Sequence, residues 1–185
     1  MKRTKPYSTL FLDRDGVINK QRPHDYVKSP DEFIFIEGTL EALRLLSPLF
    51  DHIVIVTNQR GVGKGVMNME TLEEIHASML ATIALHGGRI DNIYVCTATS
   101  DSHKSRKPNI GMALQAKQDF PDIDFSRSIM VGDSFSDMEF ARRACIPRFL
   151  IGEKYDQSKD TFKTQYNWFP DLLTFAKQLI KDIQA

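Results

Sequence analysis

The residues with the clearest chemical potential are Asp13 and Asp15, which stand one position apart in the segment T-L-F-L-D-R-D-G-V-I-N. An apolar run leads up to Asp13, and a glycine follows Asp15. Taken alone, the segment is equally compatible with a turn, because short acidic side chains hydrogen-bond to their own backbone. The alternative is a site in which the two carboxylates perform metal-assisted chemistry.

A third carboxylate, Asp133, follows another apolar run in V-G-D-S-F-S-D. Three carboxylates at one place raise each other's pKa unless a cation lies among them. Oxygen ligands suit Mg²⁺, which binds phosphate alongside one or two carboxylates. A carboxylate beside such an ion can attack phosphorus and form an aspartyl-phosphate. A second carboxylate two positions on can protonate the leaving oxygen and then deprotonate the hydrolytic water.

Phosphoryl transfer depends on alignment and charge neutralisation, so hydroxyl and cationic partners are expected near the carboxylates. The segment T-N-Q-R-G offers the hydroxyl of Thr57, and K-S-R-K-P-N offers Arg106 and Lys107. The glycines of Q-R-G-V-G-K-G add backbone N–H groups. This stretch is not a P-loop, because that pattern needs Gly and Ser or Thr where the chain has Asn58 and Gly65.

Apolar runs alternate along the chain with helical patterns. Strands are expected at 8–13, 52–58, 90–98, 126–134 and 147–152, and helices at 37–50, 68–87, 109–120, 136–145 and 169–184. This alternation predicts βαβ units in a doubly wound parallel sheet, a three-layer α/β/α fold. Ligands bind outside the carboxyl ends of such strands, so Asp13, Thr57 and Asp133 should meet at one edge.

Length and composition restrict the class of protein. A chain of 185 residues suits one domain spanning 1–185. A formal net charge of zero argues against a nucleic-acid or membrane surface as partner, and no apolar run is long enough to cross a membrane. With two distant cysteines and no signal-type apolar segment, we expect a cytoplasmic protein without disulfides. We also expect a monomer whose partner is a small phosphorylated molecule.

The motifs together carry a resemblance. Through D-R-D-G-V-I-N (13–19), T-N-Q (57–59), R-K-P (106–108) and V-G-D-x-x-x-D (131–137), the sequence resembles the haloacid dehalogenase superfamily of phosphatases. More narrowly, it is similar to the uncapped branch, subfamily IIIA, of heptose bisphosphate and histidinol-phosphate phosphatases. Between the first three motifs each stretch holds a loop, a helix and a strand, which leaves no room for a cap domain.

The resemblance implies a role for each matched residue. Asp13 is the expected nucleophile and a Mg²⁺ ligand, and Asp15 is the general acid and base that also binds the metal through its backbone carbonyl. Thr57 and Lys107 are expected to hold the transferring phosphate. The remaining roles are metal ligand for Asp133, support of the metal shell for Asp137, and substrate binding for Asn58, Gln59, Arg60 and Arg106.

Two departures from the family pattern affect these expectations. Relatives in this branch usually carry a zinc loop before R-K-P, with a Cys-x-His and a Cys-x-Cys pair. Here only Cys96 and His103 have suitable side chains, so a set of four ligands cannot be assembled locally and no structural zinc is expected. Cys96 is instead expected to be a buried strand residue. Relatives also often have lysine after the last motif's first aspartate, where this chain has Ser134.

The sequence is compatible with three functions. A Mg²⁺-dependent phosphatase on a small phosphorylated metabolite, such as heptose 1,7-bisphosphate or histidinol phosphate, agrees with every motif. A polynucleotide 3′-phosphatase would share the T-N-Q segment, but the zero net charge argues against it. A non-catalytic binding domain would have no reason to keep the carboxylates together with Lys107.

Overall fold

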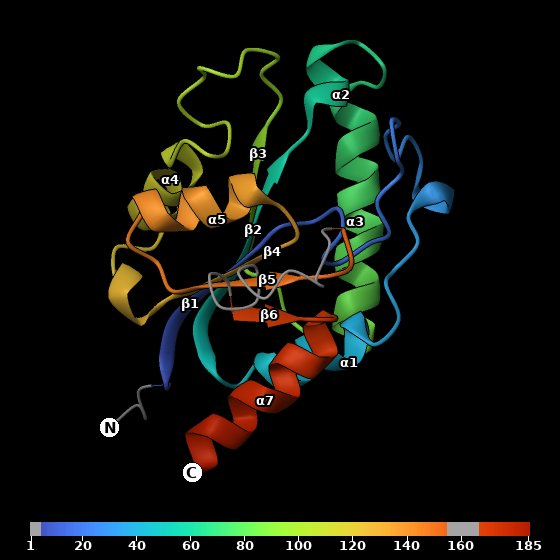
Figure 1. Cartoon of the computed structure of the whole chain (residues 1–185). Helices are drawn as coiled ribbons and strands as arrows, with labels where there is room; N and C mark the ends of the chain where they lie inside the picture. Colours follow the sequence, from blue (N-terminus) through green and yellow to red (C-terminus); the bar gives the residue numbers. More distant parts are fainter. Residues whose placement is uncertain (1–4, 155–166) are drawn as a thin grey trace.

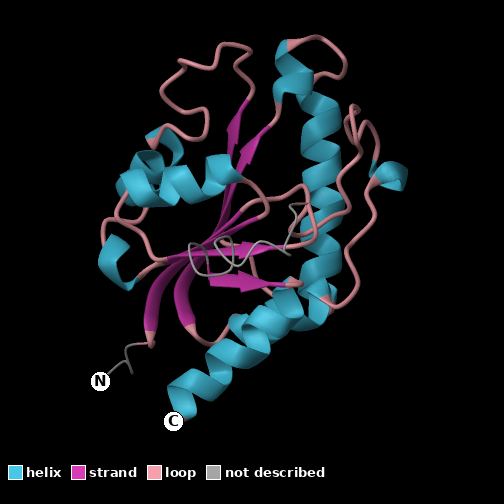
Figure 2. Cartoon of the chain, in the orientation of Figure 1, coloured by secondary structure: helices cyan, strands magenta, loops and turns pink. Residues whose placement is uncertain are grey.

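The sheet at the centre of the computed structural model, which describes residues 5–154 and 167–185, is entirely parallel (Figure 1; Figure 2). Its strands lie in the spatial order β3-β2-β1-β4-β5-β6. Their bounds are β1 Tyr7–Leu12, β2 Phe50–Asn58, β3 Asn92–Cys96, β4 Ile129–Gly132, β5 Arg148–Ile151 and β6 Asn167–Phe169. The doubly wound parallel sheet predicted from the sequence is therefore confirmed.

The strands β1 and β2 are buried on both faces of the sheet. Leu10 of β1 pairs in register with Ile53 of β2 on one side and with Ile129 of β4 on the other. Because alternate side chains of a strand point to opposite faces, Leu10 and Phe11 pack into two different clusters. The continuous apolar run of β2 therefore corresponds to a strand covered by helices on both sides.

Helices form the two outer layers (Figure 1). The helices α1, α3 and α7 pack with Leu10 and its neighbours, whereas α4 and α5 pack with Phe11 and its neighbours. Their bounds are α1 Thr39–Leu46, α3 Met69–Leu85, α4 Gly111–Asp119, α5 Phe135–Arg143 and α7 Leu172–Gln184. The predicted three-layer arrangement is thus present, with element ends shifted by a few residues from their expected positions.

Several short elements were not predicted. They are η1 Pro30–Glu32, α2 Arg60–Gly63, η2 Phe125–Arg127 and β6. Segments of three or four residues are too short to display a helical or strand period, which is why pattern analysis missed them. The helix predicted over 37–50 begins at Thr39 in the structure. Gly38 is the N-cap of α1, and the buried Thr39 hydroxyl donates to the Val17 carbonyl.

The sheet order places the end of β1 at a topological switch point. The chain leaves β1 through η1 and α1 to reach β2 on one side, whereas β4 lies on its other side. Residues 13–49 contain only η1 and α1, and residues 59–91 contain only α2 and α3. The carboxyl end of β1 is therefore open to a ligand at the place where doubly wound folds bind one.

No helix in residues 5–154 and 167–185 has the length and hydropathy needed to cross a membrane.

Candidate active site

The loop after β1 is a tight turn built around Gly16. Its amide donates to the Asn19 carbonyl at 2.8 Å, and its φ is +86°, a conformation that side chains disfavour. A Cβ atom at position 16 would lie 2.2 Å from Oδ2 of Asp133. The glycine of the D-R-D-G motif therefore lets the loop pass directly against the carboxylate that follows β4.

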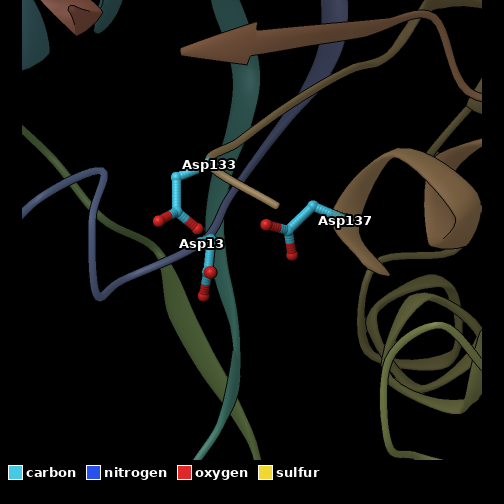
Figure 3. Close-up of side chains that lie close together, drawn as sticks. All are labelled: Asp13, Asp133 and Asp137. Carbon is cyan, nitrogen blue, oxygen red and sulfur yellow. The ribbon is translucent and has the colours of Figure 1, made fainter. Parts of the chain in front are cut away.

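Three carboxylates gather at this edge of the sheet. Oxygens of Asp13, Asp133 and Asp137 all lie within 4.8 Å of one another. Figure 3 shows them converging from three different elements, the ends of β1 and β4 and the first turn of α5. Asp133 is 5% exposed and Asp137 is fully buried. A Cβ at Gly132 would lie 2.3 Å from the Asp137 side chain, so this glycine also permits the close approach.

Lys107 is the cation inside this cluster. Its ammonium lies 2.9 Å from Asp13 Oδ1 and 2.6 Å from Asp137 Oδ1, and the residue is only 3% exposed. Burial lowers the pKa of Lys107, but the two carboxylates outweigh it and the pKa is raised. Asn58 fixes the Lys107 backbone by accepting from its amide at 3.1 Å and donating to its carbonyl at 3.2 Å.

The cluster carries more negative charge than Lys107 can neutralise. Burial and then Asp137 raise the pKa of Asp13 well above its ordinary value, although Lys107 partly offsets this. Burial and Asp137 likewise raise the pKa of Asp133 to about 6. Close carboxylates with raised pKa values are the expected electrostatics of a cation site. The all-oxygen donor set fits Mg²⁺, and Asp13 and Asp133 are the carboxylates that could hold it.

Asp137 differs from these two ligands because both of its oxygens are occupied by protein donors. Oδ1 accepts from Lys107 at 2.6 Å, and Oδ2 accepts from the Ser134 hydroxyl at 2.7 Å and the Ser134 amide at 3.1 Å. Ser134 and Asp137 also form the capping box of α5. This arrangement agrees with the supporting role expected for Asp137 rather than with direct ligation.

Asp15 points into a different environment. Nη2 of Arg14 donates to both of its oxygens at 3.0 Å, and Asn19 and Gln59 donate at 2.9 and 2.8 Å. Burial raises the pKa of Asp15, but the Arg14 charge and these hydrogen bonds outweigh it and lower the pKa. Two aspartates that are neighbours in sequence therefore have opposite electrostatics, which is the pattern expected for separate chemical roles.

A cavity of about 230 Å³ opens onto these groups. Its walls include four of the predicted acidic and basic site residues together with the predicted substrate contacts from T-N-Q: Asp13, Asp15, Lys107, Asp133, Asn58 and Gln59. Thr57 lies beneath this surface, 1% exposed, and its hydroxyl accepts from Gln59 at 2.9 Å. Residues of the loop 21–27 complete the walls together with Arg14, Ser134, Ser136 and Lys154.

Two predicted substrate contacts lie outside this lining. Arg60 and Arg106 both form ion pairs with Asp101, a residue whose side chain is 85% exposed. One carboxylate therefore holds both guanidinium groups beside each other at the rim. In this arrangement they meet a ligand only if it extends beyond the cavity or if Asp101 releases them.

Three side chains that are joined by close contacts to Asp15 or Asp133 were not predicted as site residues from the sequence: Arg14, His76 and Lys154. Arg14 is 1% exposed, and its Nη1 lies 3.0 Å from Nε2 of His76. A signal for His76 was available, because it falls on the apolar stripe of α3 formed by residues 72, 75, 79 and 83. Lys154 follows β5 outside every motif, yet its ammonium lies 3.4 Å from Asp133.

The segment that replaces the zinc loop keeps its two suitable side chains together. Sγ of Cys96 lies 3.7 Å from Nδ1 of His103, and Cys96 is buried in β3, as expected. Within residues 5–154 and 167–185, three or more side chains that could ligate a metal come together only in the aspartate cluster described above. The absence of structural zinc stays a prediction of the sequence.

Known proteins share this arrangement of elements and motifs. A family model described as "Polynucleotide kinase 3 phosphatase" matches residues 9–170, which include all four motifs. The chain belongs to this family of haloacid dehalogenase-type phosphatases. Membership accounts for the order in which the acidic motifs, T-N-Q and R-K-P follow one another along the chain.

Individual relatives are similar over most of their length. The D-glycero-alpha-D-manno-heptose-1,7-bisphosphate 7-phosphatase of Mycobacterium bovis is 42% identical over 71% of this chain and 70% of its own. The D-glycero-beta-D-manno-heptose-1,7-bisphosphate 7-phosphatase of Rhodopseudomonas palustris is 36% identical over 79% of this chain and 84% of its own. A crystal structure of the D,D-heptose 1,7-bisphosphate phosphatase of B. bronchiseptica, complexed with magnesium and phosphate, superposes with a TM-score of 0.82 at 31% identity, covering 95% and 99%.

Proposed function

We propose that this phosphatase is Mg²⁺-dependent and acts through an aspartyl-phosphate formed on Asp13. The observation that carries the proposal is the placement of Asp13. Its carboxylate lies 2.9 Å from a buried ammonium, within the aspartate cluster and at the wall of a cavity. The magnesium and phosphate in the similar B. bronchiseptica structure support the same assignment.

In the first step, an Asp13 carboxylate oxygen forms a bond to phosphorus as the bond from phosphorus to the ester oxygen breaks. Asp15 gives its proton to that oxygen, and Lys107 neutralises charge on the phosphoryl oxygens. An arriving phosphate raises the pKa of Asp15, since like charges disfavour ionisation, and so favours its protonated form. Asp13, Asp133 and the Asp15 carbonyl would hold Mg²⁺, which would supply further charge neutralisation.

In the second step, water replaces the aspartate on phosphorus. Asp15, now ionised, accepts a proton from the water, whose oxygen bonds to phosphorus while the bond to Asp13 breaks. Arg14, Asn19 and Gln59 favour the ionised form of Asp15, which suits its action as a base in this step. Inorganic phosphate leaves and the Asp13 carboxylate is regenerated.

We propose heptose 1,7-bisphosphate as the substrate, with hydrolysis at the 7-phosphate. Relatives that are 42% and 36% identical are named for this reaction, although their names differ in the anomer. A second hollow of about 260 Å³ shares Gln21, Asp133 and Lys154 with the first cavity. The two hollows together offer room for a substrate that extends well beyond one phosphate, as a sugar bisphosphate does.

The substrate assignment predicts the outcome of a screen with purified protein and Mg²⁺. Both anomers of heptose 1,7-bisphosphate, histidinol phosphate and 3′-phosphorylated DNA are compared by phosphate release. We expect kcat/KM for one heptose anomer to exceed that for every other compound by at least about 10²-fold, the usual scale of discrimination by a pocket contact or two. A higher kcat/KM for histidinol phosphate would reassign the substrate.

Polynucleotide 3′-phosphatase activity is the second candidate, because the family description names it. Its substrate requires a basic surface that follows the nucleic-acid backbone, whereas the chain has no net charge. In the same screen, a DNA substrate preferred over both heptose anomers would establish this candidate. A steep fall of that activity with added salt would accompany it.

Lys154 provides a prediction about substrate binding. Lys107 and Arg14 are buried in ion pairs, whereas the Lys154 side chain is 39% exposed and 3.4 Å from its partner Asp133. When Mg²⁺ occupies Asp133, the ammonium is free to bind a substrate phosphate. Lys154→Gln is expected to raise KM about three- to tenfold with kcat nearly unchanged, since a partly exposed charge contact contributes about 1 kcal/mol.

The matched control for this variant is Lys177→Gln, which removes an exposed lysine of α7 whose ammonium lies 3.9 Å from Glu41. It is expected to keep the wild-type KM. If Lys154→Gln also keeps it, Lys154 does not contact the substrate. A change confined to the Mg²⁺ concentration at half-maximal rate would instead place its effect on the metal.

A further inference from the structure

His76 and Arg14 form a buried pair beneath the catalytic loop. His76 is 8% exposed on α3, and Arg14 is 1% exposed between the two catalytic aspartates. Their side chains meet at 3.0 Å between His76 Nε2 and Arg14 Nη1. Because a guanidinium can only donate, Nε2 of His76 is the acceptor and the imidazole is neutral, with its proton on Nδ1.

The other end of the guanidinium holds Asp15. Nη2 of Arg14 donates to both carboxylate oxygens at 3.0 Å. The Phe33 ring lies 5.9 Å from the guanidinium carbon, and Nε of Arg14 is buried without a hydrogen-bond partner in the described part of the chain. The direction of the guanidinium is therefore set by His76 at one end and by Asp15 at the other.

We infer that His76, acting through Arg14, is a positioning residue that holds the Asp15 carboxylate in the orientation needed for proton transfer to the leaving group. The inference rests on the proposed role of Asp15 as general acid. A buried arginine without the His76 acceptor would have an unsatisfied N–H, and the group would turn to find another partner. Asp15 would then lose the contact of its two oxygens with Nη2 of Arg14. Its proton would no longer point at the ester oxygen of the substrate.

The protonation state of His76 supports this role. Burial, followed by the neighbouring Arg14 charge, lowers the pKa of His76 to about 4. The imidazole is therefore neutral at neutral pH, as an acceptor for a guanidinium has to be. A protonated ring in the same place would repel Arg14.

The test compares two leaving groups in His76→Phe and His76→Gln. An alkoxide leaves only with a proton from Asp15, whereas p-nitrophenolate leaves without one. We expect His76→Phe to lose about tenfold in kcat/KM on the sugar bisphosphate that the wild type hydrolyses fastest, and less than about twofold on p-nitrophenyl phosphate. His76→Gln, whose amide oxygen can accept from Arg14, is expected to retain most of the activity on both.

Two further variants keep the inference falsifiable. His86→Phe, an exposed histidine at the end of the same helix, is the matched control and is expected to behave as wild type on both esters. If His76→Phe does not fold, Arg14→Lys replaces it, because a single ammonium nitrogen does not bridge His76 and Asp15 as the two guanidinium nitrogens do. This variant should give the same contrast between the esters.

An equal loss on both esters would overturn the inference, because a purely structural defect does not distinguish leaving groups. Wild-type kinetics in His76→Phe, or a loss in His76→Gln as large as in His76→Phe, would overturn it as well. A wild-type protein that hydrolyses neither ester would overturn the proposed function itself, and with it the role of Asp15.

Discussion

Asp13→Asn is expected to reduce phosphatase activity by on the order of 10⁴-fold or more while the protein stays folded. An amide oxygen does not form an aspartyl-phosphate, and the substitution also removes a carboxylate from the cation site. The shape of the side chain is preserved, and Lys107 keeps its 2.6 Å contact with Asp137. The measurement is phosphate release together with acid-quenched detection of the phosphoenzyme, which should be absent in the variant.

The control for this variant is Asp122→Asn, which makes the same chemical change at a side chain that is 68% exposed and paired with His52. It should keep wild-type turnover. Thermal unfolding of both variants shows whether the loss is one of chemistry or of folding. If Asp13→Asn retains more than a few per cent of activity, or still forms a phosphoenzyme, another residue attacks phosphorus.

Removal of Mg²⁺ is expected to abolish turnover, and its return to restore it. The three carboxylates lie within 4.8 Å of one another, and Lys107 is their buried protein cation. Without a further cation, the repulsion between Asp13, Asp133 and Asp137 makes a second negative group such as phosphate unfavourable at the same place. The measurement is activity after chelation and after titration of Mg²⁺. Full activity in chelator would contradict a metal role for this cluster.

The same site predicts how Mg²⁺ binding depends on pH. Burial and Asp137 raise the pKa of Asp133 to about 6, above that of an unfolded aspartate. The folded protein without metal therefore takes up protons more readily than the unfolded chain, and its stability falls as the pH rises through the unfolded value towards 6. Above pH 6, Mg²⁺ replaces the missing proton. Its stabilising shift in Tm should therefore be larger at pH 8 than at pH 5.

Asp133→Asn distinguishes this explanation from a general effect of salt. The variant has no carboxylate to protonate at this position, so its Tm shift with Mg²⁺ should be small at both pH values. Mg²⁺-free buffers of equal ionic strength serve as the comparison. A wild-type Mg²⁺ shift that is independent of pH would show that Asp133 is not a ligand.

Much of the fold could be predicted from the sequence because its elements are long and regular. The apolar run of β2 and the amphipathic pattern of α3 set the alternation of strands and helices, and the alternation sets a parallel sheet. Since the carboxyl ends of parallel strands share one edge, the positions of Asp13 and Asp133 after their strands sufficed to predict that they meet. The family motifs then supplied the expected roles.

The sequence also leaves predictions that the fold does not test. A cytoplasmic monomer with a single domain over 1–185 is one of them, and the absence of structural zinc is another. Each depends on the surroundings of the chain or on the metal content of the protein, and neither is a property of side-chain packing.

Only the tertiary structure decided what each charged group near the site contacts. Arg60 and Arg106 were expected at the substrate, but an exposed Asp101 pairs with both of them at the rim. Lys154 carries no motif and reaches Asp133 only because β5 lies beside β4 in the sheet. Such contacts join residues distant in sequence, and nothing local in either segment encodes its partner.

Asp13 and Asp15 show most clearly what the sequence and the tertiary structure each decide. The sequence by itself determined that Asp13 and Asp15 follow a buried strand at the edge of the sheet where doubly wound folds bind ligands. The tertiary structure decided how they differ, because Lys107 and Asp137 of α5 lie beside Asp13, whereas Asp15 pairs with Arg14, which contacts His76 of α3. Burial and neighbouring charge set a carboxyl's pKa, and both depend on which helices pack around the loop.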